Sequence, residues 1–312
     1  MVPKPHHDYL GPGDPIGEGD SYVLYDFLPQ ELADVAFDLL KKEVKWNKMS
    51  HRGGEVPRLV AVEGSVLEDG SHPVYRHPAD ESPPLLPFSP TVERIRQNVE
   101  AVLHEPVNHV LIQHYRSGAD YISEHSDKTI DVVRGSKIVN VSLGAQRVMT
   151  LRTKKDALAH PKADPGAVAT DASDKDGKKR AYQRVPLPHN SIFVMGLATN
   201  AKWMHSIRTD KRPIVEKTEA ELYKDGGRIS LTFRTIGTFL TQDESYIYGQ
   251  GAKGKTRAEA RPVVRGGEDA ERLLTAFGAE NHQSDFDWDA NYGEGFDVLH
   301  FRPNHEQPSR NL

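Results

Sequence analysis

In seven short segments of the chain, the side-chain pattern repeats every two residues. This period is typical of β-strands, whose side chains point alternately to the two faces of a sheet. Turn-rich connections separate these segments. A series of short strands joined in this way predicts an all-β sandwich, barrel or jelly roll. The predicted strands cover residues 107–115, 137–143, 147–152, 182–187, 191–195, 203–207 and 228–236.

Two helices are expected before these strands, after a short strand at 22–27. Apolar residues at helical spacing give each helix one face to bury. The first helix begins near Pro29, and its apolar face consists of Leu32, Val35, Ala36, Leu39 and Leu40. The second covers 90–103, with a stripe formed by Val92, Ile95, Val99 and Val102. The fold class is therefore mainly β, of the α+β type.

Three stretches differ in amino-acid composition from this core. Residues 1–20 are rich in Pro, Gly and Asp and predict a disordered lead-in, and the polar stretch 154–180 predicts a surface loop. Residues 241–312 are expected to form an extension packed on the core domain 21–240. Within it, residues 268–277 are typical of a short helix, with Gly278 as its C-cap.

The composition limits the kinds of site that the chain can build. It has no cysteine, so it has no disulfide partners, and any metal must bind to His, Asp, Glu or backbone oxygen. No stretch is apolar for the roughly 18 residues that a membrane helix needs. A net charge of −5 is unusual for a non-specific nucleic-acid binder but leaves room for a local basic face. A cytoplasmic or nuclear location is expected.

His125 and Asp127 form the first candidate site. Side chains two positions apart on extended backbone point the same way, so both can face one metal ion. Two histidines and one carboxylate on one side of a metal are the arrangement of non-haem Fe(II) oxygenases. The pair alone is also compatible with a solvated surface cluster, and a third ligand would have to come from elsewhere in the chain.

The segment from Arg228 to Arg234 alternates strictly, with both arginines, Ser230 and Thr232 on one face and apolar residues on the other. Arginine binds carboxylates through a planar two-pronged fork. If this face is buried, it indicates a pocket for a dianion, because an unpaired buried charge is unfavourable. If it is exposed, it is the polar side of an ordinary amphipathic strand.

In this order, several motifs resemble the AlkB-like dioxygenases, closest to the eukaryotic branch that repairs alkylated DNA and RNA. The matching motifs are Val56 to Leu59, Leu111 to Tyr115 with Gly118, His125 to Asp127, Val141 to Arg147, Trp203 to Ser206, and Arg228 to Arg234. The resemblance implies a double-stranded β-helix (jelly roll) core with N-terminal supporting helices. It also implies Fe(II), 2-oxoglutarate and O₂ as cofactor and co-substrates.

The family pattern assigns roles to individual residues. It makes His125, Asp127 and His205 the catalytic iron ligands. It pairs Arg228 with the distal carboxylate of 2-oxoglutarate and Arg234 with the carboxylate near the metal. Tyr115 would donate a hydrogen bond to the co-substrate.

The sequence departs from the family pattern at three positions. Gln113 and Ser230 replace asparagines at the co-substrate site, and both keep hydrogen-bonding capacity. Thr129 stands where nucleic-acid-repairing members carry an acidic residue that meets the flipped base. Tyr75 and His77 align with the base-stacking segment and are candidate walls of the substrate pocket, although an exposed loop is the other interpretation.

The resulting hypothesis is an Fe(II)- and 2-oxoglutarate-dependent dioxygenase that demethylates alkylated nucleobases in DNA or RNA. The alternative is the same chemistry, as hydroxylation, desaturation or demethylation, on a small-molecule metabolite. A third possibility, a binding module without turnover, is disfavoured by the intact set of metal ligands and arginines.

Overall fold

The computed structural model describes residues 9–51, 54–78, 83–156, 169–170 and 180–302. The start of the predicted lead-in and most of the predicted surface loop at 154–180 lie outside these residues. Among the described residues, none of the helices combines the length and the apolar character needed to span a bilayer.

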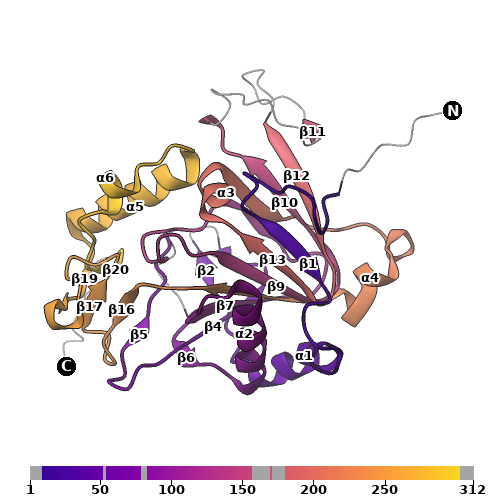
Figure 1. Ribbon diagram of the computed structural model, residues 1–312, viewed down its shortest axis with the longest axis horizontal. Helices are drawn as coiled ribbons and strands as arrows, with labels where there is room; N and C mark the ends of the chain where they lie inside the picture. Colours follow the sequence, from indigo (N-terminus) through magenta and orange to yellow (C-terminus); the bar gives the residue numbers. More distant parts are fainter. Residues whose placement is uncertain (1–8, 52–53, 79–82, 157–168, 171–179, 303–312) are drawn as a thin grey trace, which may run out of the picture.

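Two sheets, antiparallel except for the parallel pair β4–β6, face each other and form the centre of the molecule (Figure 1). The larger sheet has the order β1-β13-β9-β15-β7-β4-β6, and the smaller sheet has the order β11-β12-β10-β14-β8. The strands of the larger sheet are β1 (Tyr22–Tyr25), β4 (Leu59–Gly64), β6 (Leu85–Pro87), β7 (His109–Tyr115), β9 (Ile138–Gly144), β13 (Ser191–Met195) and β15 (Arg228–Arg234). Those of the smaller sheet are β8 (Ile122–His125), β10 (Arg147–Thr153), β11 (Ala169–Thr170), β12 (Ala181–Leu187) and β14 (Trp203–Ile207).

The order in which the chain visits the two sheets defines a jelly roll. From β7 to β10 the chain alternates between the larger and the smaller sheet, and from β12 to β15 it alternates again. Sequence neighbours such as β7 and β8 therefore lie in opposite sheets, while β15 pairs with both β7 and β9. This topology confirms the predicted double-stranded β-helix. All seven predicted core strands are present, and β4, β6, β8 and β11 are additional.

The N-terminal helices α1 (Gln30–Glu43) and α2 (Pro90–Leu103) cover the outer face of the larger sheet. In α2, Pro90 opens the helix, where its missing N–H costs nothing, and Val92, Ile95 and Val99 are buried as predicted. In α1 the prediction was wrong at Val35, which is 42% exposed. The buried face of α1 is instead formed by Leu32, Ala33, Ala36, Phe37 and Leu40.

Residues 9–20 are ordered against the core, unlike the predicted lead-in. Ile16 is fully buried in the cluster between the sheets. Glu18 accepts a hydrogen bond from the Trp203 indole, and Asp20 accepts from the backbone N–H of Ala198 at the start of α3 (Leu197–Lys202). The Pro- and Gly-rich composition therefore reflects turns, since this segment is held by its side chains.

The C-terminal region packs beside the jelly roll, to the left in Figure 1. It contains α5 (Gly267–His282), α6 (Trp288–Tyr292) and a four-stranded sheet with the order β18-β17-β16-β5, to which β5 (His72–Pro73) is added from the chain before α2. The helix predicted to end at Gly278 continues to His282, so the C-cap assignment was wrong. An interior glycine costs a helix only about 1 kcal/mol, and the last turn makes contacts with the core that outweigh this cost.

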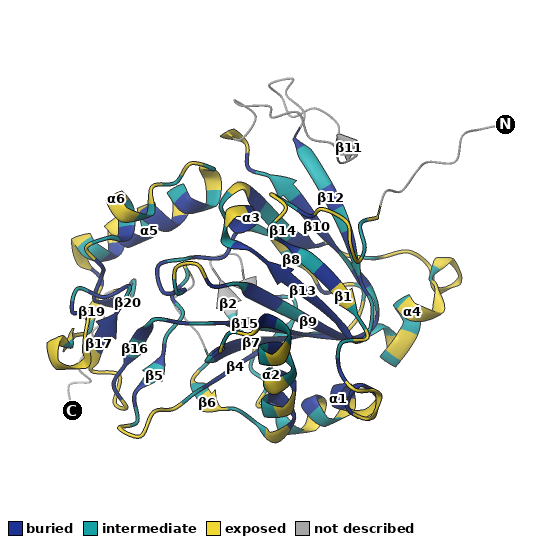
Figure 2. Cartoon of the chain, viewed as in Figure 1, coloured by how far each residue is buried: buried dark blue, intermediate teal, exposed yellow. Residues whose placement is uncertain are grey.

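The remaining short elements belong to this sheet, to the parallel pair β19–β20 and to the separate pair β2–β3, which lies between α1 and β4 in the sequence. The strands are β5 (His72–Pro73), β16 (Thr238–Leu240), β17 (Tyr246–Gly249) and β18 (Arg261–Pro262), with the pairs β19 (Val264–Arg265) and β20 (Val298–His300), and β2 (Ser50–His51) and β3 (Gly54–Glu55). A short helix, α4 (Glu219–Leu222), precedes β15. Figure 2 shows that the inner side of α5 is buried and its outer side is exposed.

Candidate metal centre

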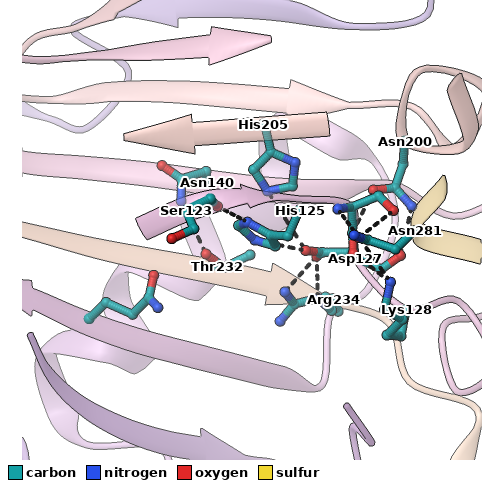
Figure 3. Close-up of polar contacts among 12 residues, drawn as sticks. Ser123, His125, Asp127, Lys128, Asn140, Asn200, His205, Thr232, Arg234 and Asn281 are labelled. Atoms are coloured by element: carbon teal, nitrogen blue, oxygen red, sulfur yellow. Dashed lines mark hydrogen bonds and ion pairs between the residues drawn. The ribbon is translucent and has the colours of Figure 1, made fainter. Parts of the chain in front are cut away.

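Three potential metal ligands meet between the two sheets (Figure 3). His125 is the last residue of β8, and His205 lies directly opposite it on β14. Asp127 follows β8, and its Oδ1 is 3.8 Å from Nε2 of each histidine. One ligand atom from each residue lies within 4.8 Å of the others. Ligands about 2.1 Å from one shared ion stand roughly 3–4 Å apart, so the 3.8 Å separations between Asp127 and the two histidines suit a single metal ion.

Hydrogen bonds fix the His125 ring and the backbone of Asp127, whereas Nδ1 of His205 is buried without a partner among the described residues. The Nδ1 atom of His125 lies 2.8 Å from the carbonyl oxygen of Ser123, which leaves Nε2 facing Asp127. Asn200 holds the Asp127 backbone in both directions: its Oδ1 accepts from the Asp127 N–H, and its Nδ2 donates to the Asp127 carbonyl. Such outer contacts set the tautomer and direction of metal ligands.

The protonation states also suit a metal. Burial lowers the pKa of the His205 imidazole to about 3, and burial likewise lowers the pKa of His125. Burial alone would raise the pKa of the Asp127 carboxyl, but Arg234 and the two histidines hold that pKa well below its usual range. The three residues therefore present two neutral imidazoles and one carboxylate, which are the protonation states that metal binding requires.

Arg228 is buried in the larger sheet, at the opposite end of β15 from Arg234. Its Nε donates to Ser142 Oγ at 2.9 Å, and its NH2 donates to Ser142 Oγ and Asn140 Oδ1. Its NH1 is buried and has no hydrogen-bond partner among the described residues. Since buried polar groups are almost always paired, this free donor indicates a place for an anionic ligand.

Arg234 lies at the metal end of the same strand face. Its Nε and NH2 both donate to Oδ2 of Asp127, at 2.9 and 2.5 Å, while its NH1 is buried without a partner among the described residues. The guanidinium also lies 4.1 Å above the Tyr75 ring. Arg234 therefore contacts the metal carboxylate directly, which the sequence did not predict, and keeps one donor for a ligand.

A cavity of about 530 Å³, counting the space at its open mouth, lies between the sheets. The predicted iron ligands and co-substrate residues all line it, together with apolar residues of both sheets. The predicted residues in its walls are His125, Asp127, His205, Arg228, Arg234, Tyr115, Gln113 and Ser230. The polar face of β15 is thus buried and faces a cavity, so the interpretation as a solvent-exposed strand face was wrong.

The three predicted substrate residues are not among the described residues that line this cavity. The Tyr75 hydroxyl accepts a hydrogen bond from the Lys128 N–H. His77 is half-buried, with its ring 6.0 Å from that of Tyr75. Thr129 donates its hydroxyl to Glu280 of α5. Tyr75 therefore supports the loop that carries Asp127, and Thr129 connects that loop to α5.

Several residues of the site were not predicted from the sequence. Asn140 and Ser142, which orient Arg228, lie at alternate positions of the neighbouring strand β9, on the same face of the sheet as Arg228. Their alternation could have been recognised in the sequence. Asn200 gave no such signal, because the site residue that it holds lies 73 positions away.

The fold and the site together define a metal-dependent jelly-roll protein with the ligand set of non-haem iron oxygenases. A model of the 2OG-Fe(II) oxygenase superfamily matches residues 20–234, and the chain belongs to this superfamily. The resemblance to AlkB-like dioxygenases is also confirmed. Human DNA oxidative demethylase ALKBH2 is 35% identical over 151 residues, which cover 48% of this chain and 48% of that protein.

Two further relatives match over longer regions. The DNA oxidative demethylase ALKBH2 of Arabidopsis thaliana is 26% identical over 235 residues, covering 71% of this chain and 68% of that protein. The bovine alpha-ketoglutarate-dependent dioxygenase alkB homolog 3 is 26% identical over 214 residues, covering 67% and 64%. The chain spans about half the length of the mammalian ALKBH2 proteins that it matches.

Proposed function

We propose that this protein is an Fe(II)- and 2-oxoglutarate-dependent dioxygenase that oxidatively demethylates alkylated nucleobases in DNA or RNA. One observation carries the proposal. The cluster His125, Asp127 and His205 lies in the wall of a cavity that Arg228 and Arg234 also line, and each guanidinium has a buried NH1 without a hydrogen-bond partner among the described residues. A cation site and an anion site in one cavity match a metal with a dicarboxylate co-substrate.

The side chains fit iron. Two imidazoles and one carboxylate would hold the ion on one side and leave positions opposite for other ligands. Arg234 donates twice to Oδ2 of Asp127, which leaves Oδ1 free to face the histidines. Arg234 thereby orients the carboxylate and disperses its charge.

The side chains also fit 2-oxoglutarate. Arg228 would bind one carboxylate through NH1, while Ser142 and Asn140 hold the rest of its guanidinium in place. Tyr115 and Gln113 lie in the same wall and offer further hydrogen bonds. Bound together, iron, 2-oxoglutarate and O₂ supply hydroxylation of a substrate carbon with formation of succinate and carbon dioxide, and a hydroxylated N-methyl group leaves as formaldehyde.

The nucleobase substrate is supported by the relatives whose names describe DNA demethylases. A nuclear location, a cytoplasmic location, or both, would suit such a substrate. A small-molecule substrate is the second candidate. Thr129 favours this candidate, because position 129 has no acidic side chain that could contact a cationic base. The Thr129 hydroxyl donates its hydrogen bond to Glu280 instead.

Removal of one metal ligand tests the enzyme class. With Fe(II), 2-oxoglutarate and ascorbate, His205→Ala is expected to abolish succinate formation, because two protein ligands hold iron too weakly. Circular dichroism checks that the variant is folded. His104→Ala, which changes a histidine outside the cavity at the end of α2, is the matched control and keeps full turnover. Succinate formation by a folded His205→Ala protein at the wild-type rate contradicts the proposed metal centre.

A substrate panel separates the two candidates. N-methylated single- and double-stranded oligonucleotides are compared with free methylated heterocycles, with formaldehyde as the readout. Formaldehyde from oligonucleotides supports the proposed function. Formaldehyde from free heterocycles alone, under conditions where succinate is formed, supports the small-molecule candidate instead.

A further inference from the structure

The loop that carries Asp127 is held from outside the jelly roll. Residues 126–129 follow β8 and belong to no strand or helix, so their backbone N–H groups have no regular partners. Each of the four donates to a side chain instead. The acceptors are Asn281 for Ser126, Asn200 for Asp127, the Tyr75 hydroxyl for Lys128 and Glu280 for Thr129. Two of the four acceptors therefore belong to α5, in the C-terminal region.

Asn281 binds one side of this loop. Its Oδ1 accepts from the Ser126 N–H at 3.0 Å, from Ser126 Oγ at 3.4 Å and from Lys128 Nζ at 3.3 Å. Figure 3 shows Asn281 reaching the loop beside Asp127 and Lys128. A single amide oxygen thus connects the residues immediately before and after the candidate metal ligand.

Glu280 binds the other side of the loop. Its Oε1 accepts from both the N–H and the hydroxyl of Thr129, and its Oε2 accepts from the Tyr292 hydroxyl at 2.8 Å. The side chain is buried, and burial raises the pKa of its carboxyl. Both oxygens are engaged in holding the structure together, so Glu280 does not face the cavity.

The last turn of α5 is itself anchored to the core. Lys154, a fully buried residue immediately after β10, donates from Nζ to the carbonyl oxygens of Glu280 and Gln283. A lysine at the carboxyl end of a helix caps carbonyls that have no partner in the helix. The turn that carries Glu280 and Asn281 is therefore held by Lys154 of the core as well as by its contacts with the loop 126–129.

We infer that Glu280 and Asn281 are positioning residues for Asp127 and that α5 is part of the metal centre. The inference rests on the proposed function, because it needs the metal at His125, Asp127 and His205. Without the two α5 side chains, the loop loses half of its backbone acceptors, and Asp127 spends less time where the histidines can share an ion with it. Removing outer contacts of this kind typically weakens metal binding roughly 10- to 100-fold.

The test measures the affinity of the full-length apoprotein for Co(II) and the visible absorption of the complex, both independent of turnover. Asn281→Ala and Glu280→Ala are each expected to weaken binding roughly 10- to 100-fold and to alter the absorption bands. Asn281→Asp keeps the acceptor oxygen and is expected to restore affinity. Glu271→Gln, an exposed carboxylate change on the same helix, is the matched control and leaves binding unchanged.

Two additional variants make every outcome decisive. If Glu280→Ala does not fold, Thr129→Val removes the hydroxyl bond to Glu280 from the loop side with little change in shape, and a weaker affinity supports the inference. Wild-type affinity and absorption in folded Asn281→Ala and in Thr129→Val overturn it. His205→Ala distinguishes a failure of the inference about α5 from a failure of the proposed metal centre. If this variant also binds Co(II) like the wild type, the proposed metal centre itself is wrong.

Discussion

Arg228 places a guanidinium in the protein interior, and the neighbouring side chains satisfy only some of its hydrogen-bond donors. Ser142 and Asn140 accept from Nε and NH2, and the Tyr115 ring lies 5.1 Å below the cation. Burial lowers the pKa of the guanidinium to about 10, so it stays charged at neutral pH. The remaining NH1 donor is what a bound carboxylate would satisfy.

Replacing Arg228 by Met, which retains much of its volume, is expected to raise the 2-oxoglutarate concentration needed for half-maximal succinate formation. Truncating one side of a buried charged hydrogen bond costs roughly 2 kcal/mol or more, equivalent to at least about thirtyfold in affinity. Arg228→Lys keeps the charge but loses the fork, so an intermediate requirement is expected. An unchanged requirement in Arg228→Met excludes the carboxylate contact.

The residues of the site differ in whether their contacts can be predicted from the sequence. Alternation on β15 predicts correctly that Arg228 and Arg234 share a face, because the period of a strand is local. His205 could be connected with His125 only through family resemblance, since a contact 80 positions away leaves no local pattern. The Arg234–Asp127 pair was missed for the same reason.

His109 supplies a prediction about pH. It is buried on β7, its Nδ1 has no hydrogen-bond partner among the described residues, and burial lowers the pKa of its imidazole to about 3. In the unfolded chain this imidazole takes up a proton near its usual pKa of about 6.5. Between these two pKa values the unfolded state binds more protons than the folded state. The free energy of unfolding therefore rises with pH in this range, and the contribution of His109 is lost progressively as the pH falls below about 6.5.

Urea unfolding of the apoprotein between pH 7.5 and 4.5 measures this slope. His109→Gln is expected to reduce it by up to about 1.4 kcal/mol per pH unit, the contribution of one titrating group. Val110→Ala on the same strand is the control, because it lowers stability at every pH by opening a cavity in the core without altering the slope. Parallel slopes in wild type and His109→Gln show that His109 does not carry the effect.

At the scale of elements, the sequence predicted periodic segments well and failed where long-range contacts decide. α2 and β13 have the predicted bounds, because their patterns are strong and their ends are marked. α5 passes through Gly278 because Glu280 and Asn281 gain partners in a loop about 150 residues earlier in the sequence. β8 was not predicted as a strand, since its four residues are too few to show a period.

Gly278 itself can be tested. Its backbone has ordinary helical geometry, and a methyl group added there would meet no atom within 4 Å. Gly278→Ala is therefore expected to stabilise the protein by about 0.5–1 kcal/mol, because alanine restricts the unfolded chain more than glycine does. Thermal unfolding should show a higher midpoint.

Gly144 is the matched control for this substitution. It has a φ of +90°, and a Cβ there would lie 2.3 Å from the carbonyl oxygen of Gly227. The same change at Gly144 is expected to lower the unfolding midpoint. A lower midpoint for Gly278→Ala would contradict the continuous helix.

At the scale of the whole molecule, one buried ion pair connects the jelly roll, the segment after the metal loop and the C-terminal region. Arg76 and Asp131 are 1% and 0% exposed, with NH2 and Oδ1 2.6 Å apart. The Arg76 guanidinium also donates to the carbonyl oxygens of Gly251, Phe296 and Val298. The C-terminal region is thus bonded to the core through a cation that has no access to water.

Arg76→Ala is expected to lower the free energy of unfolding by about 3–5 kcal/mol, because it leaves Asp131 as an uncompensated buried charge. The exposed pair Arg134–Asp289 joins the same two regions but is 58% and 68% exposed, so Arg134→Ala should cost at most about 1 kcal/mol. Urea unfolding followed by circular dichroism and by tryptophan fluorescence measures the losses in both variants.

Trp288 lies in the C-terminal region and Trp46 and Trp203 in the core, so coincident transitions in the wild type show that the regions unfold together. Equal losses in the two variants would mean that burial does not set the strength of this connection, and separate transitions would mean that the C-terminal region folds independently of the metal centre that it contacts.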